Sequence, residues 1–220
     1  MKNQAVMFDL DGTLADTLAD IAAAGNHMLS QFSQAPLPMQ RYRYLAGQGV
    51  RYLVREALNT HDSDDRIERG IALVEGFYAQ HEHERTVAYP GVDDLLEALS
   101  RRGVAMAVLS NKPDAPARHL VAHLFADLEF QAVRGHRDGA ALKPDPAAAL
   151  EIARELAIPP ENWLYVGDTA VDMQTGRGAG MTTVGVTWGF RDEPELLESG
   201  AQAIIHEPMQ LLECLLCEAS

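Results

Sequence analysis

The chain has 220 residues, of which 47% are hydrophobic, and this apolar share is sufficient for a folded protein with a packed core. Its net charge of −14 opposes binding to DNA, RNA and anionic membrane surfaces, and no run of Lys or Arg offsets that charge locally. We therefore expect no nucleic-acid or membrane partner. An anionic substrate would need a local positive centre, a bound cation or backbone amides.

The cysteines and the N-terminus carry little targeting information. Cys214 and Cys217 cannot form a disulfide framework, and without a second pair they do not complete a zinc site. Asp9 and Asp11 interrupt the apolar stretch at residues 5–8, so we predict no signal peptide, and no segment approaches the ~18 apolar residues of a membrane span. The sequence thus predicts a soluble, cytoplasmic protein.

Short apolar runs of strand length alternate with helical patterns along the chain. The runs are Ala5–Phe8, Val104–Leu109, Leu128–Val133, Trp163–Val166 and Thr182–Val186, with Ala203–Ile205 as a sixth candidate. Helical patterns cover residues 92–99, 145–157 and 171–179. This alternation predicts an α/β fold, a doubly wound, Rossmann-like parallel sheet with helices on both faces.

One connection is much longer than the others. Residues 17–88 contain no convincing strand pattern, although a crossover needs only ~10–12 residues. Apolar side chains recur at helical intervals within residues 45–58 and 67–78, and Tyr89-Pro90-Gly91 marks a boundary. We therefore expect a catalytic core of residues 1–16 and 89–220. A helical cap of residues 17–88 would cover the carboxyl edge of the sheet, where open α/β sheets bind ligands.

Two carboxylates follow the first predicted strand. Asp9 and Asp11 are two residues apart and therefore face the same side, which is unfavourable unless a cation or a proton lies between them. Two turn-forming aspartates before Gly12 would be the structural alternative. A calcium-binding EF-hand is excluded, because Leu14 and Asp20 occupy the positions that require Gly and Glu.

Polar groups also follow the other predicted strands. They are Ser110-Asn111-Lys112-Pro113, Lys143-Pro144 and Asp168-Thr169-Ala170-Val171-Asp172. Because the carboxyl ends of parallel strands meet at one edge of a sheet, we expect these groups to surround a single crevice. Clustered carboxylates suit Mg²⁺, and a hydroxyl beside a lysine suits a phosphate group.

The order and spacing of these motifs resemble a known enzyme superfamily. Asp9-x-Asp11-Gly12-Thr13, Ser110, Lys143-Pro144 and Gly167-Asp168-x-x-x-Asp172 are similar to the four motifs of the haloacid dehalogenase-like hydrolases. Residues 110–113, 167–173 and 185–190 further resemble the phosphoglycolate phosphatase branch. The resemblance spans the chain, since the helical insertion is similar to that superfamily's cap. It implies a Mg²⁺-dependent phosphatase acting on a small phosphorylated metabolite, with 2-phosphoglycolate as the favoured substrate.

The resemblance also implies roles for individual residues. Asp9 would attack phosphorus and form an aspartyl-phosphate, while Asp11 would serve as general acid and then general base. Lys143 would hold Asp9 and the phosphoryl group. The implied metal ligands are Asp9, the backbone carbonyl of Asp11, and Asp168, with Asp172 in support. The implied phosphate-binding residues are Ser110, Asn111, Lys143 and Thr13.

Several assignments stay open at this point. In the expected cap, Arg51 or Gln48 would reach a substrate carboxylate, although a solvated turn explains the glycine-rich segment equally well. Lys112 has two interpretations, a surface charge, which we slightly favour, and a substrate contact. We expect Asp16 at the start of the first cap helix, and Trp188 either beside the pocket or packed beneath it.

The alternative functions use the same residues. A phosphosugar phosphatase or a β-phosphoglucomutase-like phosphotransferase would need the same two aspartates, and a non-catalytic phosphate-binding regulator would keep the scaffold. The complete set of catalytic positions favours an enzyme. A monomer and a weak homodimer are equally compatible with the sequence.

Overall fold

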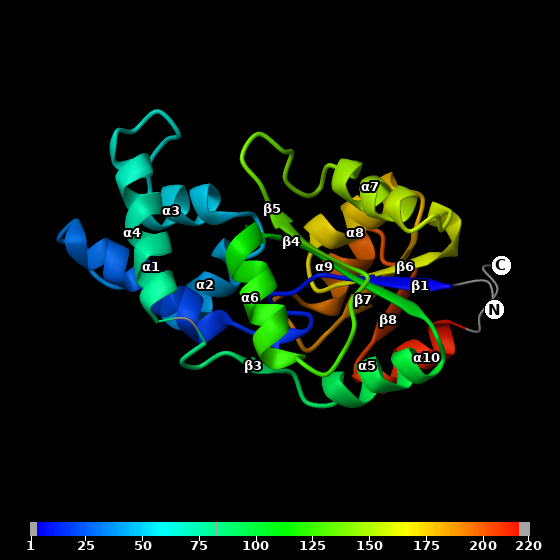
Figure 1. The fold of residues 1–220 in the computed structure, drawn as a ribbon. Coiled ribbons are helices and arrows are strands. Elements are labelled where there is room, and N and C mark those ends of the chain that lie inside the picture. Colours follow the sequence, from blue (N-terminus) through cyan, green and yellow to red (C-terminus); the bar gives the residue numbers. More distant parts are fainter. Residues whose placement is uncertain (1–3, 82, 216–220) are drawn as a thin grey trace.

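A six-stranded parallel sheet forms the centre of the computed structural model, which describes residues 4–81 and 83–215 (Figure 1). The strand order is β5-β4-β1-β6-β7-β8. The strands are β1 (Ala5–Phe8), β4 (Ala105–Pro113), β5 (Ala132–His136), β6 (Trp163–Gly167), β7 (Thr182–Val186) and β8 (Ala203–Ile205). This architecture confirms the predicted doubly wound α/β fold.

Strand β5 overlaps only the end of the apolar run that predicts it. The run Leu128–Val133 suggests a strand, but β5 begins at Ala132. Leu128 and Phe130 are apolar because they pack against the hydrophobic cluster of the sheet from an irregular segment, and the Phe125 and Phe130 rings lie 6.0 Å apart. Burial without strand pairing therefore produced the same pattern as a strand.

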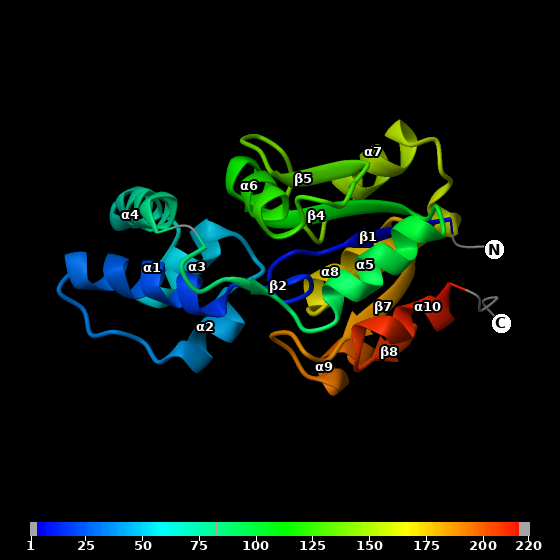
Figure 2. The same ribbon diagram turned by 60° about the horizontal axis from the view of Figure 1, so that its bottom comes forward.

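Both faces of the sheet are covered, as alternating side chains require. Along β1, Val6 and Phe8 pack into one cluster with residues of α5 (Val92–Arg101) and α6 (Asp114–Leu124). Ala5 and Met7 pack into a second cluster with α7 (Ala147–Glu155). Figure 2 shows α5 and α10 (Leu211–Cys214) together on one face. The centre of β1 is thus shielded from water, and its polar chemistry is confined to the carboxyl end.

The long insertion between β2 (Ala15–Asp16) and β3 (Val87–Ala88) is helical. It contains α1 (Leu18–Gln31), α2 (Met39–Leu45), α3 (Val50–Leu58) and α4 (Arg66–Gln80). These helices share a hydrophobic core of their own, which includes Met28, Tyr42 and Val54. Close packing is built into it, because a Cβ at Gly25 would lie 2.3 Å from the Tyr42 ring. We refer to residues 17–86 as the helical insertion.

The helical insertion lies at the carboxyl ends of the sheet strands, and α10 lies at the opposite end (Figure 1). The antiparallel pair β2–β3, with Ala15 opposite Ala88 and Asp16 opposite Val87, connects the insertion to the sheet. Leu18 N donates to Asp16 Oδ1, which is consistent with the expected place of Asp16 before the first insertion helix. The division into a core and a cap with boundaries at residues 16 and 88 stays a prediction.

The ends and surfaces of the chain add two observations. No helix within residues 4–81 and 83–215 is long and apolar enough to cross a membrane. Cys214 is the last residue of α10, whereas Cys217 lies outside the described residues.

Candidate active site

The carboxyl end of β1 brings Asp9 into the interior. Asp9 is buried, and its backbone N–H donates to the Val166 carbonyl of the adjacent strand over 2.9 Å. The chain then turns at Gly12, whose φ of +92° lies in the region that favours glycine. The turn is closed by hydrogen bonds from the backbone of Leu14 and Ala15 to the Leu10 carbonyl. The nucleophile expected from the sequence is therefore held on a rigid strand end.

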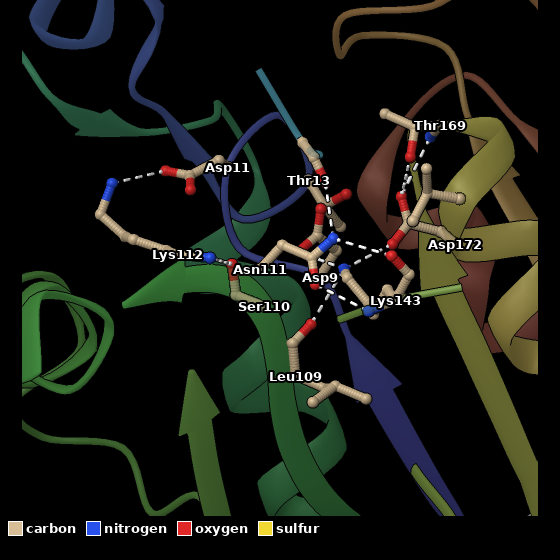
Figure 3. Close-up of polar contacts among 12 residues, drawn as sticks. Asp9, Asp11, Thr13, Leu109, Ser110, Asn111, Lys112, Lys143, Thr169 and Asp172 are labelled. Carbon is tan, nitrogen blue, oxygen red and sulfur yellow. Dashed lines mark hydrogen bonds and ion pairs between the residues drawn. The ribbon is translucent and has the colours of Figure 1, made fainter. Parts of the chain in front are cut away.

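Lys143 links two carboxylates of the site. Its Nζ lies 2.8 Å from Asp9 Oδ1 and 2.7 Å from Asp172 Oδ1, and it also donates to the Leu109 carbonyl over 3.1 Å (Figure 3). Burial alone would lower the pKa of Lys143, but Asp172 and Asp9 outweigh burial and raise it well above its ordinary value. Lys143 is consequently a permanent cation beside Asp9.

Asn111 fixes the backbone that carries Lys143. The Asn111 carboxamide accepts a hydrogen bond from Lys143 N over 2.8 Å and donates to Lys143 O over 3.1 Å. The same Nδ2 donates to the Gly47 carbonyl in the helical insertion over 2.9 Å. One side chain therefore ties the end of β4 both to the lysine loop and to the insertion.

Asp168 follows β6 and is completely buried beside the Gly12 turn. Its Oδ1 accepts a hydrogen bond from Thr13 Oγ1 over 3.2 Å, and its Oδ2 accepts one from Phe190 N over 2.7 Å. The backbone approaches so closely that a Cβ at Gly12 would lie 2.2 Å from Asp168 Oδ2. A side chain other than hydrogen at position 12 is thus incompatible with this arrangement.

Asp172 lies in the first turn of α8 (Ala170–Gly178) and has two tasks. One oxygen receives the Lys143 ammonium, and the other accepts hydrogen bonds from Thr169 N at 3.1 Å and Thr169 Oγ1 at 2.6 Å. These bonds cap the helix and hold the carboxylate in one orientation. Its contact with Lys143 is the supporting position that the sequence suggested.

Three buried carboxylates meet here, because Asp9, Asp168 and Asp172 each place one oxygen within 4.8 Å of the others. Burial and the neighbouring Asp172 raise the pKa of Asp9 to about 7, although Lys143 opposes the shift. Burial, Asp172 and Asp9 likewise raise the pKa of Asp168 well above its ordinary value. One ammonium does not neutralise three carboxylates, so the donor set fits a hard divalent cation such as Mg²⁺.

The Asp11 carboxylate points away from this acidic cluster (Figure 3). Its Oδ1 lies 3.1 Å from Lys112 Nζ, and both side chains are almost fully buried. The expectation of a surface Lys112 is therefore wrong. Lys112 is buried because residues distant in the chain surround its ammonium. Asp11 comes from the turn after β1, and Tyr78 comes from α4, with the ammonium 4.2 Å from the centre of the Tyr78 ring. Asp11 is free to contribute its backbone carbonyl rather than its side chain to a metal.

A cavity of about 320 Å³ opens between the sheet and the helical insertion. Asp9, Asp11, Ser110 and Asn111 line its core side, and mostly apolar side chains of the insertion line the other. Ser110 is buried, and its Oγ accepts a hydrogen bond from Lys112 N over 3.2 Å. The predicted nucleophile and general acid thus line one cavity with two of the predicted phosphate-binding residues, whereas Lys143 and Thr13 are not among its lining residues.

The structure does not place Arg51 in the wall of that cavity. Arg51 is about half exposed and pairs with Glu68 on the helical insertion, while its neighbours Gly49 and Val50 line the cavity. Trp188 lies beneath the site, where its indole N–H donates to the Thr13 carbonyl over 3.0 Å. Of the two alternatives for Trp188, packing below the turn agrees with this bond.

Sequence reasoning missed Arg43, a residue of α2 that contacts the core. Its guanidinium donates to the carbonyls of Gly189 at 2.6 Å and Phe190 at 3.1 Å. Arg191 returns the contact by donating to the Arg43 carbonyl. Because Phe190 N binds Asp168, the helical insertion holds the loop that orients a carboxylate of the acidic cluster. No local pattern around Arg43 signals this contact.

Comparison with known proteins agrees with this geometry. The haloacid dehalogenase-like hydrolase family matches residues 6–186. A phosphoglycolate phosphatase of Pseudomonas putida is 39% identical over 190 residues, which cover 84% of this chain and 70% of that protein. Phosphoglycolate phosphatase 1 of Pseudomonas aeruginosa is 36% identical over 214 residues, covering 95% of this chain and 78% of that protein.

A solved structure from Lactobacillus delbrueckii subsp. bulgaricus is similar over its whole length. It is 32% identical in sequence with a TM-score of 0.92, and the alignment covers 99% of this chain and all of that one. The match of the family across most of the chain, together with these relatives, identifies the superfamily. The chain therefore belongs to the haloacid dehalogenase-like hydrolases.

Proposed function

We propose that this protein is a Mg²⁺-dependent phosphatase that hydrolyses a small phosphomonoester, 2-phosphoglycolate, through an aspartyl-phosphate on Asp9. The observation that carries the proposal is the position of Asp9, which lines the cavity, pairs with Lys143 and belongs to the buried acidic cluster. The names of the Pseudomonas relatives favour this substrate over the phosphosugar alternatives.

In the first step, a carboxylate oxygen of Asp9 attacks phosphorus and the bond to the ester oxygen breaks. The departing alkoxide takes a proton from Asp11, and glycolate leaves. In the second step, Asp11 accepts a proton from water, whose oxygen attacks the aspartyl-phosphate and releases inorganic phosphate together with the free Asp9 carboxylate. The two aspartates divide one difficult displacement into two easier ones.

The remaining side chains position the phosphoryl group. Lys143 supplies positive charge to its oxygens, and Ser110, Thr13 and the Asn111 N–H supply hydrogen bonds. Asp9, the Asp11 carbonyl and Asp168 would hold Mg²⁺, and Asp172 would support the set through Lys143. The metal, when bound, supplies the charge that lets an anionic carboxylate approach an anionic phosphate.

The helical insertion acts as a cap in this proposal. It closes one side of the cavity with apolar side chains, which limits the water that reaches the aspartyl-phosphate. The Asn111–Gly47 and Arg43–Gly189 hydrogen bonds support a closed arrangement. The cap would open to admit substrate and to release products.

Replacing Asp9 with Asn tests the nucleophile. The variant should release no phosphate from p-nitrophenyl phosphate or 2-phosphoglycolate in the presence of Mg²⁺, while its circular dichroism matches the parent protein. Acid quenching of the parent protein with ³²P-labelled substrate should trap label on the chain, and the Asp9→Asn variant should trap none. Retained turnover in the variant would refute the assignment. Formation of a phosphosugar isomer from a labelled phosphosugar, without free phosphate, would indicate the phosphotransferase instead.

A further inference from the structure

The cavity wall contains a positive charge of its own, distinct from the lysine that holds Asp9. We propose that Lys112 is a specificity-determining residue, whose ammonium binds a carboxylate on the carbon next to the ester oxygen of the substrate. The proposal rests on the phosphatase function above and names the group that distinguishes the preferred substrate from other phosphomonoesters.

The composition of the cavity wall singles out Lys112. Among the described residues that line the cavity, Lys112 is the only Lys or Arg, and Glu75 lies in the same wall. Most of the other lining groups are apolar, so they offer nothing to a charged substrate group. Any attraction for a second anion is therefore concentrated at Lys112, and the low polarity around it strengthens that attraction.

The Lys112 ammonium has the capacity to bind an oxygen of a ligand. Lys112 Nζ carries three donors, of which one is directed to Asp11 Oδ1 and another interacts with the Tyr78 hydroxyl. The Asp11 carboxylate lies 3.1 Å from the ammonium, and such a pair favours the charged form of the buried side chain. The residue therefore stays charged in its buried position and keeps a donor for an incoming oxygen.

A tyrosine hydroxyl close to Lys112 offers a second donor to the same ligand group. Tyr78 of α4 lines the same cavity, and Lys112 is near enough to interact with its buried hydroxyl, but the hydroxyl hydrogen has no acceptor among the residues that the structure describes. A buried donor without an acceptor costs folding free energy, and a ligand oxygen that accepts its hydrogen bond would remove this cost. Since the Lys112 ammonium lies 4.2 Å from the centre of the Tyr78 ring, both donors serve one small region of the cavity.

The charge balance favours a carboxylate over a second phosphate group. Lys112 carries one positive charge and already pairs with Asp11, so it cannot offset the two negative charges of a second phosphate group. The chain as a whole carries −14 charges, which repel a more highly charged ligand. A phosphomonoester with one adjacent carboxylate matches this pattern better than a bisphosphate.

The decisive experiment compares 2-phosphoglycolate with ethyl phosphate, which replaces the carboxylate by a methyl group. Lys112→Met should lower kcat/KM for 2-phosphoglycolate about 10- to 100-fold more than for ethyl phosphate, the range of one hydrogen bond to a charged group. The excess loss should appear mainly in KM. Lys112→Arg, which keeps the charge, should retain most of the preference. Arg101→Met removes an exposed cation paired with Glu97 and serves as the matched control, with an unchanged preference.

Equal losses for the two substrates would overturn the proposal, because Lys112 would then act only through Asp11. A parent protein that hydrolyses ethyl phosphate as well as 2-phosphoglycolate would overturn it too, while leaving the phosphatase function intact. A parent protein that hydrolyses no phosphomonoester would refute the function itself. If Lys112→Met does not fold, the test uses Lys112→Gln and measures inhibition by glycolate. The inhibition constant of glycolate should rise about tenfold or more in this variant. An unchanged constant would contradict the assignment.

Discussion

Arg43 lies in the helical insertion, yet its guanidinium donates a 2.6 Å hydrogen bond to the carbonyl of Gly189 in the sheet domain. The next residue, Phe190, accepts a second bond from Arg43 and donates its own N–H to Asp168. The position of the insertion and the orientation of a buried carboxylate are therefore linked through two consecutive residues. A change in the position of the insertion should therefore alter the orientation of the Asp168 carboxylate, and the reverse should also hold.

Arg43→Met tests this link. The loop at residues 189–190 would lose two hydrogen-bond donors, so Asp168 should be held less firmly. The Mg²⁺ concentration for half-maximal activity should therefore rise about tenfold, the smaller of the effects typical for residues that hydrogen-bond to metal ligands. A Mg²⁺ titration of phosphate release measures the shift. Arg41→Met, which removes an exposed Arg of the same helix, is the control. Equal Mg²⁺ requirements in both variants would contradict the link.

Gly12→Ala should disable the site through a steric clash. Its new Cβ would lie 2.2 Å from Asp168 Oδ2, and displacement by about 1 Å at a reacting centre lowers activity on the order of 100-fold. Gly139→Ala is the matched control, because Gly139 also has positive φ, at +79°, but has nothing within 4 Å of the added carbon. The control should lose only about 1–2 kcal/mol of unfolding free energy, with its kcat retained. Comparable loss of activity in both variants would show that backbone strain, rather than contact with Asp168, is responsible.

Lys143→Met should destabilise the metal-free protein as well as abolish turnover. Removing the ammonium leaves Asp9 and Asp172 buried without their cation, which typically costs about 3–5 kcal/mol of unfolding free energy. Urea unfolding in EDTA measures this loss. Arg118→Met breaks an exposed pair with Asp114 and should cost less than about 1 kcal/mol. Added Mg²⁺ should restore part of the stability of Lys143→Met, and the absence of any recovery would argue against a metal at the acidic cluster.

The stability of the metal-free protein should depend on the protonation of Asp9. The pKa of Asp9 is raised from 3.8 to about 7 by burial and Asp172, so between these values the folded protein binds a proton that the unfolded chain has released. The unfolding free energy should therefore fall as pH rises from about 4 to about 7, and this contribution should level off above pH 7. Urea unfolding in EDTA across this range measures the slope.

The matched variant for that measurement is Asp9→Asn, which removes one of the titrating groups and should reduce the slope, while Asp168, whose pKa is also raised, keeps its own contribution. Mg²⁺ competes with the proton for Asp9, so its apparent affinity should rise with pH through about 7. A pH-independent Mg²⁺ affinity would contradict the assignment of Asp9 as a ligand.

The sequence predicted most of the site because its chemistry follows the strand ends. Asp9, Ser110 and Asp168 each come directly after a buried apolar run, and parallel strands bring such positions to one edge. β7 and β8 coincide with their predicted runs because both are short and rich in apolar or β-branched residues, although Ala203 and Ile204 of the edge strand β8 are only partly buried. Local pattern and tertiary position agree in these segments.

The errors arose where distant residues decide the outcome. Lys112 is buried because Asp11 and Tyr78 surround its ammonium, and neither is near it in the chain. Arg43 meets a loop 146 residues away, and nothing in its own helix marks it. The apolar segment before β5 was mistaken for a strand because packing against the sheet needs the same side chains as strand pairing.

The paired strands β2 and β3 also have an evolutionary consequence. Asp16 lies opposite Val87, so the chain leaves the sheet domain and re-enters it at neighbouring points of a narrow ribbon. A segment joined in this way can be exchanged by recombination for one of another length without rethreading a sheet strand, since both junctions are already adjacent. The residues that break the phosphoester bond can thus be inherited unchanged while the enclosing segment diversifies.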